Sequence, residues 1–165
     1  MNTFLKRNFH WILAGILLII VLLFAFVSPG YYGGTDNISH YLFARYAYRH
    51  PWLFLHSWGR PLYTTLSSPF AQFGFRGSQV FNILLGIATA WLCYRIARSL
   101  EIGNPLLVMI LVCFTPLYFL MMPTALTEIL FGFVFVLTVF LFIRGHYIAA
   151  AIVISFLPFA RSEGY

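Results

Sequence analysis

A stretch of 19 residues near the start of the chain contains no charged side chain, and it reads HWILAGILLIIVLLFAFVS from 10 to 28. As an α-helix, about 20 apolar residues span the ~30 Å hydrocarbon layer of a bilayer. A cleavable secretory signal has an apolar centre of roughly 7–15 residues that ends at small residues. This stretch is longer and continues into PGYY. We therefore predict a retained transmembrane helix over residues 10–28.

Four further apolar runs follow in the second half of the sequence. They predict transmembrane helices over 79–97, 105–122, 125–143 and 146–160. The links between them are short, so consecutive helices are expected to be antiparallel neighbours. Hydrophobic residues make up 61% of the chain and charged residues 8%, against about 25% charged residues in soluble domains. The predicted fold is all-α: a polytopic membrane protein with about five transmembrane helices in one domain over 1–165.

The basic residues give the predicted orientation. With the N-terminus in the cytoplasm, five of them fall at cytoplasmic helix ends: Lys6, Arg7, Arg95, Arg98 and Arg144. Five fall outside: Arg45, Arg49, Arg60, Arg76 and Arg161. The positive-inside rule counts charges close to helix ends, and three of the outer five lie within a long loop over 29–78, so we predict this orientation. The net charge of +6 is scattered, which argues against nucleic-acid binding and favours contact with lipid phosphates.

The four acidic residues then divide unequally between the two faces. Asp36, Glu128 and Glu163 come out on the extracytoplasmic face, and Glu101 lies in a cytoplasmic turn beside Arg98. Three carboxylates from distant segments are therefore predicted to converge at one face of the membrane.

The extracytoplasmic loop over 29–78 is predicted to contain helices that lie along the membrane surface. Thr35 and Asp36 are typical of a helix N-cap, and Pro51 ends the run that follows, which predicts a helix over about 37–50. Asp36 and His40 are four residues apart and share a face of that helix. Capping and contact with substrate are compatible roles for Asp36.

Aromatic residues are frequent in the rest of this loop. Trp52, Trp58, Tyr63 and Phe70 favour a belt at the membrane interface. Walls of a lipid or sugar site are the alternative. Pro61 and Pro69 bracket a short helical turn within the same segment.

Histidine and cysteine patterns predict no metal site held by protein ligands alone. His40, His50 and His56 have irregular spacing. Cys93 and Cys113 lie inside apolar runs and are interpreted as small buried residues. A single carboxylate that joins a phosphate to hold Mg²⁺ or Mn²⁺ is the alternative that remains open.

Charged residues at the ends of two predicted helices each have two interpretations. Glu128 lies at a predicted helix start, where the helix dipole stabilises a negative charge by roughly 0.3–1 kcal/mol. Placing an ionisable group at the edge of the hydrocarbon layer costs a few kcal/mol, which is more than this gain. Glu128 therefore faces either the headgroup zone or a polar cavity. Arg161 and Glu163 form either an ion pair at the rim or a phosphate-binding arginine that Glu163 positions.

Four segments, taken in order, resemble one enzyme family. They read TDNISHYLFARYAYRH at 35–50, PLYTTLSSPFAQFG at 61–74, TALTEI at 124–129 and PFARSEG at 158–164. Together they resemble the N-terminal half of a GT-C glycosyltransferase. The nearest resemblance is to bacterial transferases that use polyprenyl-phosphate sugars, related to protein O-mannosyltransferases and lipid A aminoarabinose transferases.

The resemblance implies a fold, a reaction and a set of site residues. Members of that family have about 8 to 13 transmembrane helices, use a sugar on a polyprenyl phosphate as donor, and invert the anomeric centre. Asp36 would be the catalytic carboxylate, and Glu128, Arg161 and Glu163 would line the same cavity. We add His40 and Arg60, from the same loop, as candidate substrate-binding residues.

The sequence also departs from the family pattern. Many members carry paired acids in the first loop, whereas Asn37 follows Asp36 here. The chain also stops after five predicted helices, so we expect a truncated GT-C-like fragment that is inactive alone and a hexosyltransferase if complete. Compact loops fit a bacterial inner membrane with an extracytoplasmic active face; the sugar and the acceptor stay open. The alternatives are a component of a transporter or flippase and a non-catalytic membrane scaffold.

Overall fold

The computed structural model describes residues 3–28, 30 and 32–164, with side chains from Asn8 onward. Every regular element among these residues is helical. The α-helices are α1 (Thr3–Val27), α2 (Gly34–Tyr46), α3 (Pro61–Ala71), α4 (Phe75–Ser99), α5 (Pro105–Phe114), α6 (Pro116–Met121), α7 (Glu128–Ile143), α8 (Tyr147–Ile154) and α9 (Leu157–Ala160). Two short 3₁₀ helices, η1 (Pro51–Leu55) and η2 (Ser162–Gly164), complete them. The predicted cytoplasmic charges Lys6 and Arg7, and the first loop residue Pro29, lie outside the described residues and side chains.

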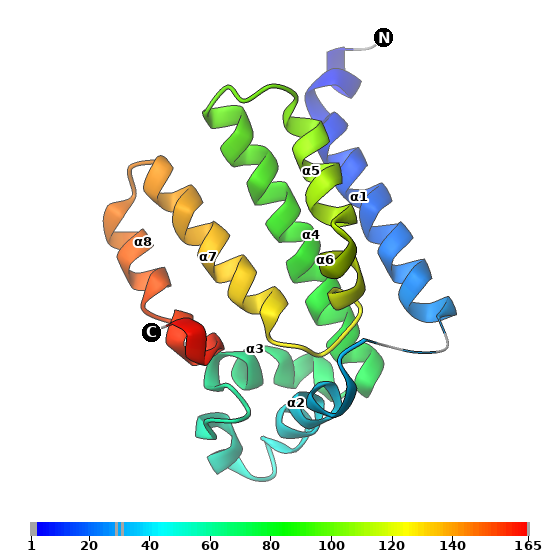
Figure 1. Cartoon of the computed structure of the whole chain (residues 1–165), viewed down its shortest axis with the longest axis vertical. Helices are drawn as coiled ribbons and strands as arrows, with labels where there is room; N and C mark the ends of the chain where they lie inside the picture. Colours follow the sequence, from blue (N-terminus) through cyan, green and yellow to red (C-terminus); the bar gives the residue numbers. More distant parts are fainter. Residues whose placement is uncertain (1–2, 29, 31, 165) are drawn as a thin grey trace.

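Helix α4 is the centre of the structure, and α1, α5 and α7 pack against it (Figure 1). The long helices stand side by side, while α2 and α3 lie across one end of them (Figure 1). The connections from α4 to α5 and from α7 to α8 lie at the opposite end. The expected surface helices between the first two long helices are therefore present, and they close one end of the bundle.

Two helices are long and apolar enough to cross a membrane: Asn8–Val27 within α1 and Phe75–Ser99. Three shorter apolar segments accompany them, over Pro105–Phe114, Glu128–Ile143 and Tyr147–Ala160. The fold class is thus all-helical as predicted, with two candidate spans.

The expected continuous helix over 105–122 is broken. Pro116 has no backbone N–H and restricts the residue before it, and Thr115 accordingly leaves the helical conformation with φ −57° and ψ 120°. The expected helix over 146–160 also divides, because α8 ends at Ile154 and α9 begins at Leu157 with a proline in its first turn. The surface helix runs from Gly34 to Tyr46 rather than over 37–50.

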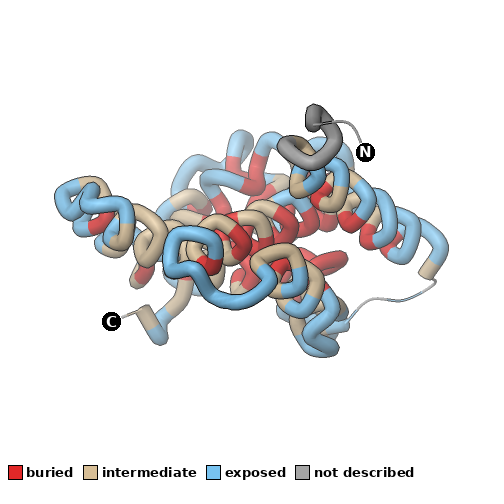
Figure 2. Tube along the Cα trace, turned by 90° about the horizontal axis from the view of Figure 1, so that it is seen from above, coloured by how far each residue is buried: buried red, intermediate tan, exposed pale blue. Residues whose placement is uncertain are grey.

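Helix α1 buries a narrow stripe and exposes the rest of its apolar surface. Ala14, Leu17, Val21 and Ala25, which recur every three or four residues, pack into the main core with α4 and α5. Ile19 and Leu23 on the outer side are 57% and 60% exposed. Buried segments gather inside the bundle and exposed ones surround it (Figure 2). An outer surface of large aliphatic side chains is typical of contact with lipid.

Helices α2 and α3, which together form the surface layer, are joined by polar contacts. The Arg45 guanidinium donates to the carbonyl oxygens of Ala71 and Gln72 at 3.0 and 2.9 Å. The Gln72 side chain donates back to the Arg45 carbonyl at 3.0 Å. These three hydrogen bonds join the ends of α2 and α3, so the layer is held as one unit against α4.

Both cysteines carry free thiols. Cys113 is completely buried in the main core, and Cys93 is half-buried on α4. Burial agrees with the interpretation of Cys113 as a small core residue.

Candidate functional site

A small cavity of about 90 Å³ lies where α2 meets the starts of α3 and α7 and the chain after α9. It is lined by Asp36, His40, Trp58, Arg60, Leu126, Thr127, Glu128 and Arg161. Five of the six predicted site residues line this cavity, and the sixth, Glu163, contacts Arg161. The three acids that were predicted to converge therefore lie at one end of the bundle. Glu101 is in the connection between α4 and α5, at the other end (Figure 1).

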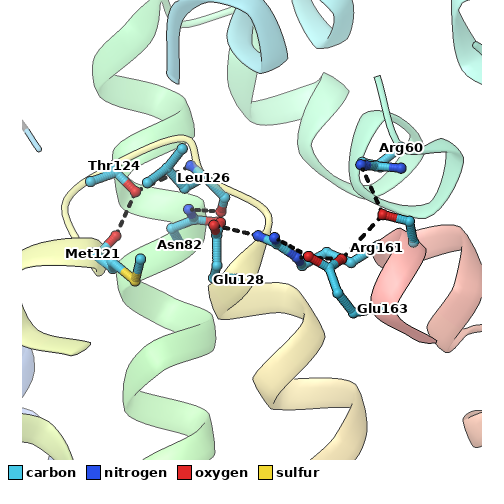
Figure 3. Close-up of polar contacts among 9 residues, drawn as sticks. Arg60, Asn82, Met121, Thr124, Leu126, Glu128, Arg161 and Glu163 are labelled. Carbon is cyan, nitrogen blue, oxygen red and sulfur yellow. Dashed lines mark hydrogen bonds and ion pairs between the residues drawn. The ribbon is translucent and has the colours of Figure 1, made fainter. Parts of the chain in front are cut away.

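Arg161 joins two carboxylates (Figure 3). Its Nη2 lies 2.6 Å from Glu163 Oε1 and its Nε donates to Glu163 Oε2 at 3.1 Å, so the pair is bidentate. Its Nη1 also forms an ion pair with Glu128. Hydrogen bonds from Arg161, together with a backbone hydrogen bond, lower the pKa of Glu163 to about 2. The same bond to Glu163 raises the pKa of Arg161, so the guanidinium stays charged at any physiological pH.

Glu128 occupies the first turn of α7, where the helix dipole favours a negative charge. One oxygen, Oε1, meets Arg161, while the other, Oε2, is buried without a hydrogen-bond partner among the described residues. A buried acceptor without a partner costs about 1–3 kcal/mol. The lining position and this vacant acceptor favour the cavity-facing interpretation of Glu128.

Asp36 does not cap α2, which corrects the sequence prediction. The N-cap is Gly33, in the left-handed region at φ 102°, and no side chain caps the helix. A side chain at position 33 would also collide with Leu126. Asp36 lies in the first turn, exposed, and has no hydrogen bond or ion pair within the described part of the chain. Its carboxylate is therefore available to a ligand.

His40 lies one helical turn after Asp36 and is 93% buried, with 7% of its surface exposed. Burial lowers the pKa of the imidazole, and the nearby carboxylates of Glu128 and Asp36 oppose that effect only in part. Its Nδ1 has no hydrogen-bond partner among the described residues. His40 is thus a neutral imidazole at pH 7 with a vacant ring nitrogen at a cavity that Asp36 also lines.

Arg60 precedes α3 and has a positive φ of 59°, which is uncommon for any residue but glycine. Its Nη2 donates to Ser162 Oγ at 3.4 Å, a weak contact that joins the first loop to the segment after α9 (Figure 3). In contrast to Arg161, Arg60 has no carboxylate partner within the described residues. Its charge is available to an anion.

Three amide side chains, none of which was predicted to be a site residue, hold the segment before Glu128. Asn37 Nδ2 donates to the Tyr32 carbonyl at 2.7 Å, and its Oδ1 accepts from the backbone N–H of Ala125. Gln79 donates to the Pro123 carbonyl at 2.7 Å, and Asn82 to the Leu126 carbonyl at 2.8 Å (Figure 3). Amides inside an apolar helix such as α4 are a usable signal, because such groups seek hydrogen-bond partners.

The aromatic residues of the first loop do not form a single belt. Trp52 is 63% exposed, as a residue of an interfacial belt would be. Trp58 lines the cavity, whereas Tyr63 is completely buried in the core beneath α3. Phe70 packs against the same core. The belt prediction is wrong for Tyr63, and Trp58 fits the alternative of a site wall.

The residues of the cavity do not suit a metal ion held by the protein. No group of three or more histidine, cysteine and carboxylate side chains that could hold one occurs in the part of the chain that the structure describes. Glu128 is already paired with Arg161, and Arg60 lines the same small space. A predicted Mg²⁺ or Mn²⁺ would need most of its oxygen ligands from a bound substrate, and we derive no chemical step through it.

Comparison of the chain with protein-family models, with curated proteins and with solved structures finds no match. The resemblance to GT-C glycosyltransferases rests on the four sequence segments alone. What the structure adds is the arrangement of their charged residues around one cavity.

Proposed function

We propose that the protein is a membrane glycosyltransferase of the GT-C type, or the N-terminal part of one. It would move a sugar from a polyprenyl-phosphate donor to an acceptor hydroxyl at the extracytoplasmic face of a bacterial inner membrane. One observation carries the proposal: an unpaired carboxylate, a neutral imidazole and two arginines from separate segments line the same small cavity.

Asp36 would be the general base. The acceptor hydroxyl oxygen attacks the anomeric carbon from the face opposite the phosphate, and the hydroxyl proton passes to the Asp36 carboxylate. The bond between the anomeric carbon and the phosphate oxygen breaks, and its electron pair leaves with the polyprenyl phosphate. A base within hydrogen-bond reach contributes about 10²–10⁴-fold to such a step. The absence of a competing partner on Asp36 in the described chain supports this role.

The two arginines would stabilise the departing phosphate. Arg60 has no carboxylate partner, so it offers a full positive charge. Arg161 is held by Glu128 and Glu163, so its position is fixed before substrate binds. Donors that are fixed in advance stabilise charge that develops in the transition state without reorganising. His40, with a vacant nitrogen, would bind a sugar hydroxyl.

This function would need about five segments of the chain to cross the membrane. The two candidate spans, in α1 and α4, would be joined by α5–α6, α7 and α8–α9, which are apolar but shorter. Their apolar outer surfaces would hold the polyprenyl tail within the bilayer. The cavity would then lie where the apolar helices meet the surface layer of α2 and α3.

A transporter or flippase component is the second candidate, and one observation favours it. Helical structure is interrupted at Thr115–Pro116 and again between α8 and α9. Discontinuous helices are typical of transporter substrate sites. The two candidates differ in product, since a transferase releases polyprenyl phosphate and a transporter leaves its substrate intact. A non-catalytic scaffold would neither release polyprenyl phosphate nor move a substrate across the membrane.

The test is sugar transfer by the protein in its native membranes, supplied with a panel of polyprenyl-phosphate hexoses, with release of polyprenyl phosphate as the readout. Asp36→Asn removes the base and keeps the shape, so we expect release to fall by about 10²–10⁴-fold. Glu101→Gln, which neutralises the carboxylate at the other end of the bundle, should leave release unchanged. Undiminished release by Asp36→Asn would refute the assigned role. Intact substrate crossing the membrane without release would favour the transporter.

A further inference from the structure

A second polar cavity, of about 400 Å³, lies at the opposite end of the bundle from Asp36. It is lined by His10, Arg95, Arg98, Ser99 and Arg144. His10 lies in the N-terminal half of α1, and Arg95, Arg98 and Ser99 lie in the last two turns of α4. Arg144 lies in the turn between α7 and α8. Three arginines and no carboxylate line this cavity.

None of these arginines is neutralised within the part of the chain that the structure describes. The contact of Arg98 is with the Tyr94 hydroxyl at 3.4 Å, and no ion pair joins it to Glu101. Like charges that share a cavity repel one another. A cavity with only cationic and donor groups is therefore complementary to an anion.

Aromatic rings hold this cavity in shape. The Arg95 guanidinium lies over the rings of Trp91 and Phe140, at 4.9 and 5.6 Å from their centroids, so it is fixed between α4 and α7. His10 stacks on Tyr94 at 5.1 Å between ring centroids. The buried Nε1–H of Trp91, beside Arg95, has no acceptor among the described residues. The arginine is positioned by neighbours that do not offset its charge.

The cavity also lies at a definite depth if the two candidate spans cross a bilayer. The apolar part of α1 begins at Asn8 and that of α4 ends at Ser99. His10 and Arg98 are within one turn of those limits, which is the depth of lipid headgroups. The phosphates of anionic lipids attract basic residues at this depth.

We propose that this cavity binds a phosphate group, that of an anionic lipid headgroup, on the membrane face opposite the proposed catalytic site. The arginine side chains present planar forks that match phosphate oxygens, and the volume accommodates a headgroup phosphate with its glycerol. This site goes beyond the proposed sugar transfer and does not depend on it.

The experiment measures lipid retention by the full protein. Purified protein is exchanged into detergent with phosphatidylglycerol or phosphatidylcholine, and bound lipids are counted by native mass spectrometry. Arg98→Gln and Arg144→Gln remove exposed cavity charges with little risk to folding. Arg49→Gln, an exposed arginine on the surface layer at the other end, is the matched control. Inorganic phosphate is added in a competition arm.

We expect the unaltered protein to retain phosphatidylglycerol in preference to phosphatidylcholine, and each cavity variant to weaken that retention roughly five-fold. The control variant should retain the lipid fully. An equal loss in Arg49→Gln, or no loss in Arg98→Gln and Arg144→Gln, overturns the site. Binding of inorganic phosphate that depends on Arg98 and Arg144, with no preference for phosphatidylglycerol, overturns the lipid as its source. Because sugar transfer is a separate readout, which Asp36→Asn is expected to reduce, failure here is distinguishable from failure of the proposed function.

Discussion

The two ends of the helical bundle handle charge in opposite ways. At the end closed by α2 and α3, Arg161 is paired with Glu128 and Glu163 around a cavity of about 90 Å³. At the other end, three arginines line a cavity of about 400 Å³ that has no acid in its wall. The first cavity is nearly neutral and two of its charged side chains are bonded to one another, whereas the second cavity is cationic and is held by aromatic rings.

The pairing of charges determines how each end can interact with a ligand. Where opposite charges hold one another, the side chains are fixed and the unpaired groups, Asp36 and Arg60, stand out as reactive or binding groups. Where like charges gather, the missing partner is an anion from outside the chain. We therefore expect sugar transfer at the end with Asp36 and lipid binding at the end with Arg98.

The largest expected effect is an all-or-none difference between the two ends in their accessibility to a reagent outside the cell. In a chain with Cys93 and Cys113 replaced by alanine, Asp36→Cys should react with a membrane-impermeant maleimide in intact cells. Glu163→Cys should do the same, whereas Glu101→Cys should react only after permeabilisation. The physical reason is that α1 and α4 would separate the ends by a full hydrocarbon layer. Labelling of positions 36 and 163 from opposite sides of the membrane would refute the assignment of both residues to one face.

Removal of Arg161 should have the next largest effect. Arg161→Met leaves Glu128 and Glu163 without their common counter-charge, and under the proposed mechanism it removes a donor to the leaving phosphate. We expect polyprenyl phosphate release to fall about 10²-fold or more. Arg98→Met at the other end should leave release unchanged within two-fold. Equal losses in the two variants would show that sugar transfer depends on overall charge and not on this arrangement.

The same substitution, asparagine to aspartate, should affect stability differently at the two ends. Asn37→Asp loses the donor to the Tyr32 carbonyl and turns a carboxylate oxygen toward it, so we expect a loss of roughly 1–3 kcal/mol in the free energy of unfolding. Asn104 caps α5 only as an acceptor, from the N–H of Leu106 at 3.2 Å. Asn104→Asp should therefore change stability little. Thermal unfolding in detergent measures both, and equal shifts would contradict the role of the Asn37 amide.

Much of this site followed from where the apolar runs end. If each of the five apolar runs reverses the chain direction, then the loop with Asp36, the start of the fourth run with Glu128 and the end of the fifth run with Glu163 fall at the same end of the bundle. The spacing of Asp36 and His40 likewise placed both on one face of a helix. These inferences need only helix geometry and the cost of burying charge.

The remaining features depend on contacts between distant segments. The Asn82 side chain bonds a carbonyl 44 residues away, and such pairs are set by how helices pack rather than by local pattern. The N-cap at Gly33 has a positive φ of 102°, which side chains rarely adopt, and Leu126 from a distant segment lies close to it. The Asn37 amide likewise donates to the Tyr32 carbonyl, a hydrogen bond that an ionised acid at this position could not make.

The smallest expected effect concerns His40 and the pH dependence of stability. Burial lowers the pKa of folded His40 below its unfolded value of 6.5, so the unfolded chain binds the extra proton first as the pH falls. Stability is therefore fully present above pH 6.5 and decreases below it until the folded imidazole also takes up a proton. His40→Gln cannot take up a proton, so its melting temperature should fall less between pH 7 and pH 5 than that of the unaltered protein. Parallel curves for the protein and His40→Gln would show that this end does not hold a neutral imidazole, and the contrast between the two ends would then rest on the arginines alone.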